Sequence, residues 1–197
     1  MVLEQNAELT PGWTYSVRAD VAHTSPPIWR QLALPGEITL GELHDVLQAS
    51  FGWDNGHLHM FTVRGTDYSS FDADSGDPLE DEDGVTLRQL VNRTGQKFTY
   101  LYDFGDSWEI RLKVEKIDRT GAGPVAVCVG GRRGGPFEDS GGIGGYENMC
   151  TVLADPNHPE HEEVAEWLGF EPGAVTFDPA VFDVSALNLV LAELPAG

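Results

Sequence analysis

The sequence is poor in cysteine and in positive charge, and it contains no long apolar run. Its two cysteines, Cys128 and Cys150, are too few for a disulfide framework and favour reduced thiols. No stretch of about 18 consecutive apolar residues is present, so no membrane-spanning helix is expected. The first residues contain neither a basic segment nor an apolar one, which argues against a secretory signal. We therefore expect a cytoplasmic protein that does not contact a membrane.

Basic residues are scarce and unevenly distributed. The chain has 12 Lys and Arg against 32 Asp and Glu, for a net charge of -20, and residues 134–197 contain no Lys or Arg. A protein with such an excess of negative charge repels phosphate backbones, whereas nucleic-acid affinity depends on basic residues that neutralise phosphates. Duplex nucleic acid is therefore not an expected partner, and the acidity is interpreted mainly as a contribution to solubility or as an adaptation to a salty cytoplasm.

The remaining composition is that of a folded protein. Apolar residues make up 41% of 197 residues, which is enough for a core and fits one domain over residues 1–197. The segments 13–21 and 28–34 are rich in strand-forming residues and predict two strands. A helix is predicted over 40–51, because Thr39 and Glu42 form a capping-box pattern before residues with helical spacing.

The middle of the chain predicts three further strands and a short helix. The strands are expected over 57–63, 97–103 and 107–117, and the helix over 85–92. The last two strands are separated by only three residues, so they predict a tight hairpin in which Gly105 takes a positive φ.

The last third is interpreted as a glycine-rich ordered loop followed by helices. Glycines crowd residues 130–145, and helical patterns follow over 146–154, 161–169 and 179–194. The C-terminal helical portion is therefore expected to cover about residues 146–194.

Four segments together carry a resemblance to a known family. They are 26–36 (PPIWRQLALPG), 40–61 (LGELHDVLQASFGWDNGHLHMF), 100–109 (YLYDFGDSWE) and 128–147. In order and spacing they resemble the plasmid pRiA4b ORF-3-like family over nearly the whole chain. The resemblance implies an α+β fold, with a mostly antiparallel sheet, helices packed on one side of it and C-terminal helices. Family members are often labelled as passengers of mobile elements, and the resemblance implies no settled activity.

An H-x-H pair is the first candidate site. His57 and His59 are two residues apart on a predicted strand, so both are expected on one face, where two imidazoles can bind one metal. Asp103 and Asp106, at the ends of the predicted hairpin loop, would complete a set for Zn or Mn. The favoured interpretation is instead that one histidine packs against Trp53 or Trp29 and forms a hydrogen bond with a carboxylate.

The hairpin and the glycine-rich segment each allow two interpretations. The side chains of Asp103 and Asp106 either fix the turn or bind a cation, an amine or an arginine. Backbone N–H groups before a helix start near Ile143 can hold an anion, although Glu138 and Asp139 would repel a phosphate there. The glycine-rich segment is therefore interpreted mainly as structural.

Arg30 is one of few basic residues in the first half of the chain. The favoured interpretation is an ion pair with one of the hairpin aspartates. Alternatively, Arg30 stacks beside Trp29 and clamps a carboxylate or a phosphate.

Two hypotheses about function follow, and they leave open whether the protein is an enzyme. The first is a binding module that recognises a peptide, a small molecule or a partner protein without a cofactor, in an aromatic and acidic cleft. The cleft would be lined by Trp29, Arg30, His44, Trp53, His57, His59, Tyr102, Asp103, Asp106, Trp108, Glu138 and Asp139. The alternative is a metal-dependent hydrolase or nuclease associated with mobile elements, in which a divalent metal activates water.

Overall fold

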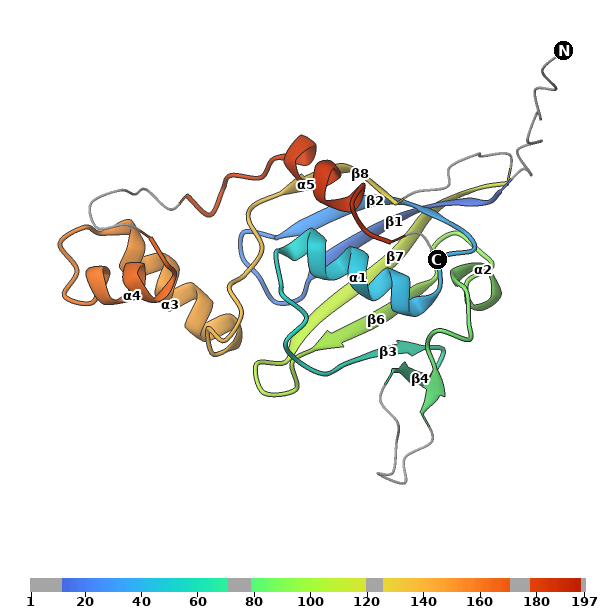
Figure 1. The fold of residues 1–197 in the computed structure, drawn as a ribbon, viewed down its shortest axis with the longest axis horizontal. Coiled ribbons are helices and arrows are strands. Elements are labelled where there is room, and N and C mark those ends of the chain that lie inside the picture. The colour runs from blue at the N-terminus through green and yellow to red at the C-terminus, as the bar shows by residue number, and fades with distance from the viewer. Residues whose placement is uncertain (1–11, 71–78, 120–125, 171–177, 196–197) are drawn as a thin grey trace, which may run out of the picture.

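The computed structural model describes residues 12–70, 79–119, 126–170 and 178–195 (Figure 1). The strands are β1 (Thr14–Val21), β2 (Trp29–Pro35), β3 (His59–Val63), β4 (Thr66–Ser69), β5 (Glu80–Asp81), β6 (Lys97–Tyr102), β7 (Trp108–Asp118) and β8 (Val127–Arg132). The helices are α1 (Leu40–Phe51), α2 (Leu87–Leu90), α3 (Gly142–Ala154), α4 (His161–Trp167) and α5 (Val184–Leu191).

One sheet contains all eight strands, in the order β5-β4-β3-β6-β7-β1-β2-β8. Every neighbouring pair is antiparallel except β4 and β5. Side chains alternate along the central strands, so that Tyr15, Val17, Ala19 and Val21 of β1 are buried while their neighbours are partly exposed. The described residues therefore form an α+β fold with a mostly antiparallel sheet, as expected.

Helix α1 covers the buried face of the sheet (Figure 1). It begins at the predicted capping box, in which Thr39 and Glu42 exchange hydrogen bonds of 2.7 and 3.1 Å. It ends at Gly52, whose φ of 78° is unfavourable for other residues. Its apolar stripe, formed by Leu40, Leu43, Leu47 and Phe51, is buried in the core.

The helices do not all pack on one side of the sheet, in contrast to the expectation. Helices α3 and α4 contact each other and lie beyond the end of the sheet, whereas α5 contacts α1 and the edge strand β8 (Figure 1). Helix α3 starts at Gly142, next to Ile143, where a helix start was expected, and four residues before the helical pattern over 146–154. Within the described residues, no helix has the length and apolar character needed to span a membrane.

The edge strand β8 was not expected, because its two glycines favour a loop interpretation. It pairs with β2 on one side. On the other side, the side-chain amide of Asn188 in α5 accepts from the Cys128 N–H at 2.8 Å and donates to the Cys128 carbonyl at 2.9 Å. The Asn188 amide therefore occupies the place that a neighbouring strand would take.

Candidate functional site

The β6–β7 hairpin is held by its first aspartate. Asp103 Oδ1 accepts from the Gly105 N–H at 2.8 Å, and the Asp103 carbonyl accepts from the Ser107 N–H at 2.6 Å. Asp103 and Ser107 take the positive φ values of 53° and 57°, so the expectation for Gly105 was wrong. The side chain of Asp103 satisfies the turn and so tolerates the left-handed conformation that was assigned to glycine.

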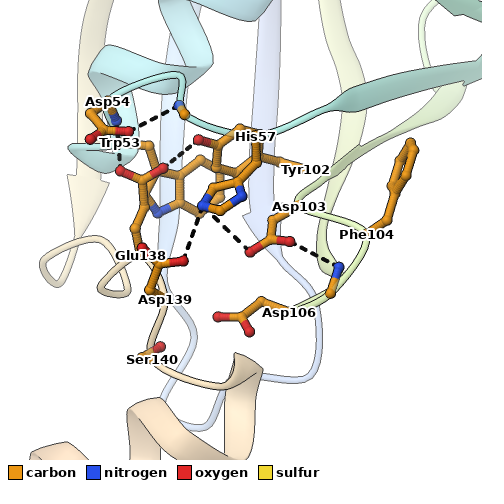
Figure 2. A network of polar contacts seen from close by, with 12 residues as sticks. Trp53, Asp54, His57, Tyr102, Asp103, Phe104, Asp106, Glu138, Asp139 and Ser140 are labelled. Carbon is orange, nitrogen blue, oxygen red and sulfur yellow. Dashed lines mark hydrogen bonds and ion pairs between the residues drawn. The ribbon is translucent and has the colours of Figure 1, made fainter.

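The glycine-rich loop reaches the hairpin because it packs directly on the end of α1. A Cβ atom at Gly135 would lie 1.8 Å from the Phe51 carbonyl oxygen, so only glycine fits there. The next residue, Pro136, accepts a 3.0 Å hydrogen bond from the Trp53 indole. This close approach positions Asp139 beside the hairpin (Figure 2).

His57 lies between two carboxylates from distant segments (Figure 2). Its Nε2 atom is 3.1 Å from Asp139 Oδ1 and 3.9 Å from Asp103 Oδ2. One ligand atom of each residue lies within 4.8 Å of the others, which is compatible with a shared metal ion. Asp103 is buried and Asp139 is exposed. We call His57, Asp103 and Asp139 the His57 triad.

Aromatic side chains pack next to the triad, and the ring of Tyr102 contacts that of His57. The Tyr102 hydroxyl donates to Glu138, and the Asp54 N–H donates to the other Glu138 oxygen at 2.8 Å. Burial raises the pKa of Glu138, and the bond from Tyr102 opposes this shift. The Trp53 ring stacks on Tyr102 at 4.9 Å and tilts against the buried Trp108 at 6.2 Å. These contacts hold Glu138, and with it Asp139, in a fixed place.

Asp106 binds the start of α3. Its Oδ2 atom accepts from the Gly141 N–H at 3.0 Å, and Gly141 is the N-cap residue of that helix. A carboxylate of the chain itself therefore accepts from one of the N–H groups that were considered as an anion site. This contact connects the hairpin to the glycine-rich loop and supports the structural interpretation of that loop.

His59 has different partners from His57. The side chain of His59 is buried, and its Nε2 lies 2.9 and 3.0 Å from the two carboxylate oxygens of Glu82. Strand β3 begins only at His59, so the alternation of side chains along a strand does not place His57 with it. The predicted set of His57, His59, Asp103 and Asp106 is thus divided among three arrangements, and Asp139 takes the place of His59 in the triad.

His44 belongs to the His59 side of the site. The two imidazole rings are stacked at 3.6 Å. His44 Nδ1 lies 2.7 Å from the Tyr100 hydroxyl, which also accepts from Gln48 at 2.8 Å. His44 Nε2 lies 2.7 Å from Asn55 Oδ1, an acceptor, so Nε2 carries the proton and Nδ1 accepts from Tyr100. Burial, with the nearby His59, lowers the pKa of His44 to about 4, so the ring is neutral at pH 7.

Arg30 and Trp29 lie away from the triad. Within the described part of the chain Arg30 forms no ion pair, so the favoured hypothesis was wrong. The buried Arg30 guanidinium stacks on Phe182 at 3.8 Å and donates to three backbone carbonyls. They belong to Ser50 at 2.8 Å, Trp29 at 2.9 Å and Arg132 at 3.3 Å. Trp29 points to the opposite face of the sheet, where it stacks with Arg18 at 4.2 Å.

Sequence reasoning did not identify Glu82, Asn55, Tyr100 and Gln48. Gln48 stands one helical turn after His44, and that spacing was a usable signal. The alternation along β6 places the ring of Tyr100 in the core, but it says nothing about the hydroxyl. Glu82 lies among several acidic residues that no periodic pattern distinguishes, so no signal in the sequence identifies it.

The fold defines an α+β protein built on one eight-stranded, mostly antiparallel sheet. The family model described as plasmid pRiA4b ORF-3-like protein matches residues 14–186, so the chain belongs to this family. It is 38% identical to the uncharacterized protein y4hQ of Sinorhizobium fredii (strain NBRC 101917 / NGR234), with 91% of each chain covered. The crystal structure of MM3350, a protein of unknown function from Methanosarcina mazei Go1, is similar with a TM-score of 0.76 and 32% identity. That match covers 90% of this chain and 98% of MM3350.

Proposed function

We propose that this protein is a binding module that recognises a basic segment of a partner peptide or protein at the His57 triad. The observation that carries the proposal is the convergence of two aspartates from distant segments on one histidine, above stacked aromatic rings. Such a rigid acidic surface favours Lys or Arg over acidic and neutral ligands, because opposite charges attract and the groups are already oriented.

Two exposed apolar side chains adjoin the triad. Phe104 is 52% exposed at the tip of the hairpin, and Leu58, which is 50% exposed, follows His57 in the chain. The Leu58 carbonyl accepts from the Asp103 N–H at 2.9 Å, which keeps these segments together. Apolar side chains beside carboxylates match the stem and the charged head of a basic side chain, which supports a peptide-borne ligand.

The binding proposal is tested by calorimetric titration with a short Arg- and Leu-containing peptide and with the same peptide carrying Gln for Arg. We expect binding of the Arg peptide alone, weakened about tenfold in the double variant Asp103→Asn, Asp139→Asn, because two charged contacts are lost. The exposed Glu193→Gln is the control for a general loss of charge. Failure of the Arg peptide to bind, or equal weakening in the control, contradicts the proposal.

A metal-dependent hydrolase or nuclease is the second candidate. It is favoured by the three ligand atoms of the triad that lie within 4.8 Å of one another. Imidazole and carboxylate groups suit Zn or Mn, and a bound metal lowers the pKa of water toward neutrality.

The metal hypothesis is tested with protein stripped by a chelator and titrated with Zn²⁺ or Mn²⁺. One metal per chain is expected, with affinity reduced at least about tenfold in His57→Gln and unchanged in the control His161→Gln. Metal-dependent cleavage of single-stranded DNA or of a phosphodiester would then assign the activity. Absence of metal uptake by the wild-type protein rejects this candidate.

A further inference from the structure

A pocket of about 410 Å³ lies between helix α3 and the turn that joins β1 and β2 (Figure 1). One wall is the face of α3 that carries Tyr146, Glu147 and Cys150, and another is the turn around Pro26. Arg133, which follows the end of β8, completes the lining. The volume is within the range of small-molecule sites, about 300–1,000 Å³, and no residue of the His57 triad lines the pocket.

The hydroxyl of Tyr146 is a buried polar group of this pocket. Tyr146 is 4% exposed, and its ring packs against Phe137 with 5.9 Å between the ring centroids. Within the described residues, the hydroxyl makes no hydrogen bond of normal geometry. Burial raises the pKa of Tyr146 to about 12, and the lining residues Cys150 and Arg133 also influence it, so the hydroxyl end lies on the side of the pocket. A protonated, unpaired hydroxyl in this position favours a ligand that accepts a hydrogen bond.

Arg133 supplies a positive charge that the protein does not neutralise by contact. Within the described part of the chain it forms no ion pair, whereas Arg18, Arg88 and Arg111 each pair with an acid. The Arg133 side chain belongs to a half-buried residue, so its guanidinium is partly withdrawn from water. A guanidinium presents N–H donors in a planar fork that matches the two oxygens of a carboxylate.

The other lining groups limit the charge of a ligand. Burial raises the pKa of the Cys150 thiol, so the thiol is neutral at pH 7 and does not repel an anion. Glu147 is exposed, lines the same pocket, and its negative charge also raises the pKa of Cys150. A single guanidinium with a carboxylate nearby tolerates a monoanion but disfavours a dianion such as a phosphate.

We propose that this pocket binds a small organic monocarboxylate. The carboxylate of the ligand accepts from the Arg133 guanidinium and from the Tyr146 hydroxyl, and its apolar body lies against Pro26 and the Tyr146 ring. The site goes beyond the proposed peptide binding, because its residues are outside the His57 triad and its ligand has the opposite charge.

The experiment titrates benzoate, benzamide and phenyl phosphate by NMR at about pH 7.5. The three compounds share one ring and differ in the head group, which is a monoanion, a neutral amide or a dianion. Benzoate is expected to bind the wild-type protein at least about tenfold more tightly than the other two. We expect Arg133→Gln to weaken benzoate binding at least about tenfold and Tyr146→Phe about fivefold.

Matched variants separate recognition from folding and from general charge. Tyr146→Phe removes only an unpaired hydroxyl, so it should not lower the free energy of unfolding. Arg132→Gln removes the same charge from an exposed neighbour outside the pocket and should leave benzoate binding within about twofold. Glu147→Gln should strengthen the binding of phenyl phosphate about fivefold, because a repelling charge is lost. Circular dichroism verifies folding, and Tyr146→Phe with the ligand series decides the test if Arg133→Gln is not folded.

Three results would overturn the inference. Equal weakening by Arg132→Gln and Arg133→Gln means that benzoate responds only to overall charge. Binding of benzamide as tight as that of benzoate means that the carboxylate is not recognised. No binding of benzoate to the folded wild-type protein removes the site altogether. The double variant Asp103→Asn, Asp139→Asn should bind benzoate like the wild type, so failure here leaves the peptide proposal at the triad standing.

Discussion

At the residue scale, the buried His44 makes the stability of the protein depend on pH. His44 is neutral because burial lowers its pKa to about 4, from an ordinary value of 6.5. In the unfolded chain, His44 takes up a proton as the pH falls through 6.5, whereas in the folded protein it does so only near pH 4. The stability that His44 contributes is therefore complete above about pH 6.5 and is lost as the pH falls toward 4.

When the pH is lowered from about 7 to about 4.5, we expect the free energy of unfolding of the wild-type protein to fall by roughly 2–3 kcal/mol more than that of His44→Gln. The reason is that the variant lacks the group that takes up a proton more readily in the unfolded chain. Urea denaturation across this range measures the difference. The control His161→Gln, in helix α4, which contains no buried residue, should keep the pH dependence of the wild type. Parallel curves for the wild type and His44→Gln would mean that another group is responsible.

At the element scale, local patterns predicted the regular elements well. Helix α1 has the bounds that its capping box and apolar spacing predict, and strands β1, β2, β6 and β7 match alternating segments within one or two residues. The failures are elements whose residues argue against them locally. Strand β8 contains two glycines and is stabilised by pairing with β2 and by Asn188, which are distant in the sequence.

The site was predicted less well than the fold, for a related reason. The hairpin aspartates, His57 and Asp139 were all identified, but their grouping depends on where each element begins. His57 falls just before β3, so the period of two that linked it with His59 does not apply. The partner of His59, Glu82, is brought to it by the sheet order, which no spacing in the sequence shows.

Two glycines give a matched test of how elements position the triad. A Cβ at Gly135 would meet backbone atoms of Phe51, whereas a Cβ at Gly144 in α3 has nothing within 4 Å. We expect Gly135→Ala to destabilise the protein by more than about 2 kcal/mol and Gly144→Ala to stabilise it by about 0.5–1 kcal/mol. Chemical denaturation of both variants provides the measurement. Similar effects of the two substitutions would contradict the close packing of the glycine-rich loop on α1.

At the scale of the whole molecule, charge is the dominant property. The basic residues of β7 pair with acids two positions along the same strand, including Arg111 with Glu109 at 2.7 Å and Lys113 with Glu115 at 3.9 Å. Each of these basic residues is thus paired with an acid beside it and does not offset the acids elsewhere. The acidic side chains in the rest of the chain therefore repel one another, and the net charge is -20.

We expect the melting temperature to rise by several degrees when NaCl is increased from about 20 mM to about 500 mM, because salt screens repulsion between exposed carboxylates. Differential scanning calorimetry at about pH 7.5 measures the shift. The gain should shrink near pH 4, where the carboxylates are partly protonated. A melting temperature that is insensitive to salt at both pH values would show that the acids do not repel one another enough to matter.

The contact between Asn188 and Cys128 has a consequence for how the chain is made. The two residues are 60 positions apart, so β8 leaves the ribosome well before α5 does. Until the last helix docks, the N–H and C=O groups of Cys128 are free to pair with a strand of another nascent chain. Protection against such mispairing is therefore among the last features the protein acquires, and a chain truncated before residue 184 would never acquire it.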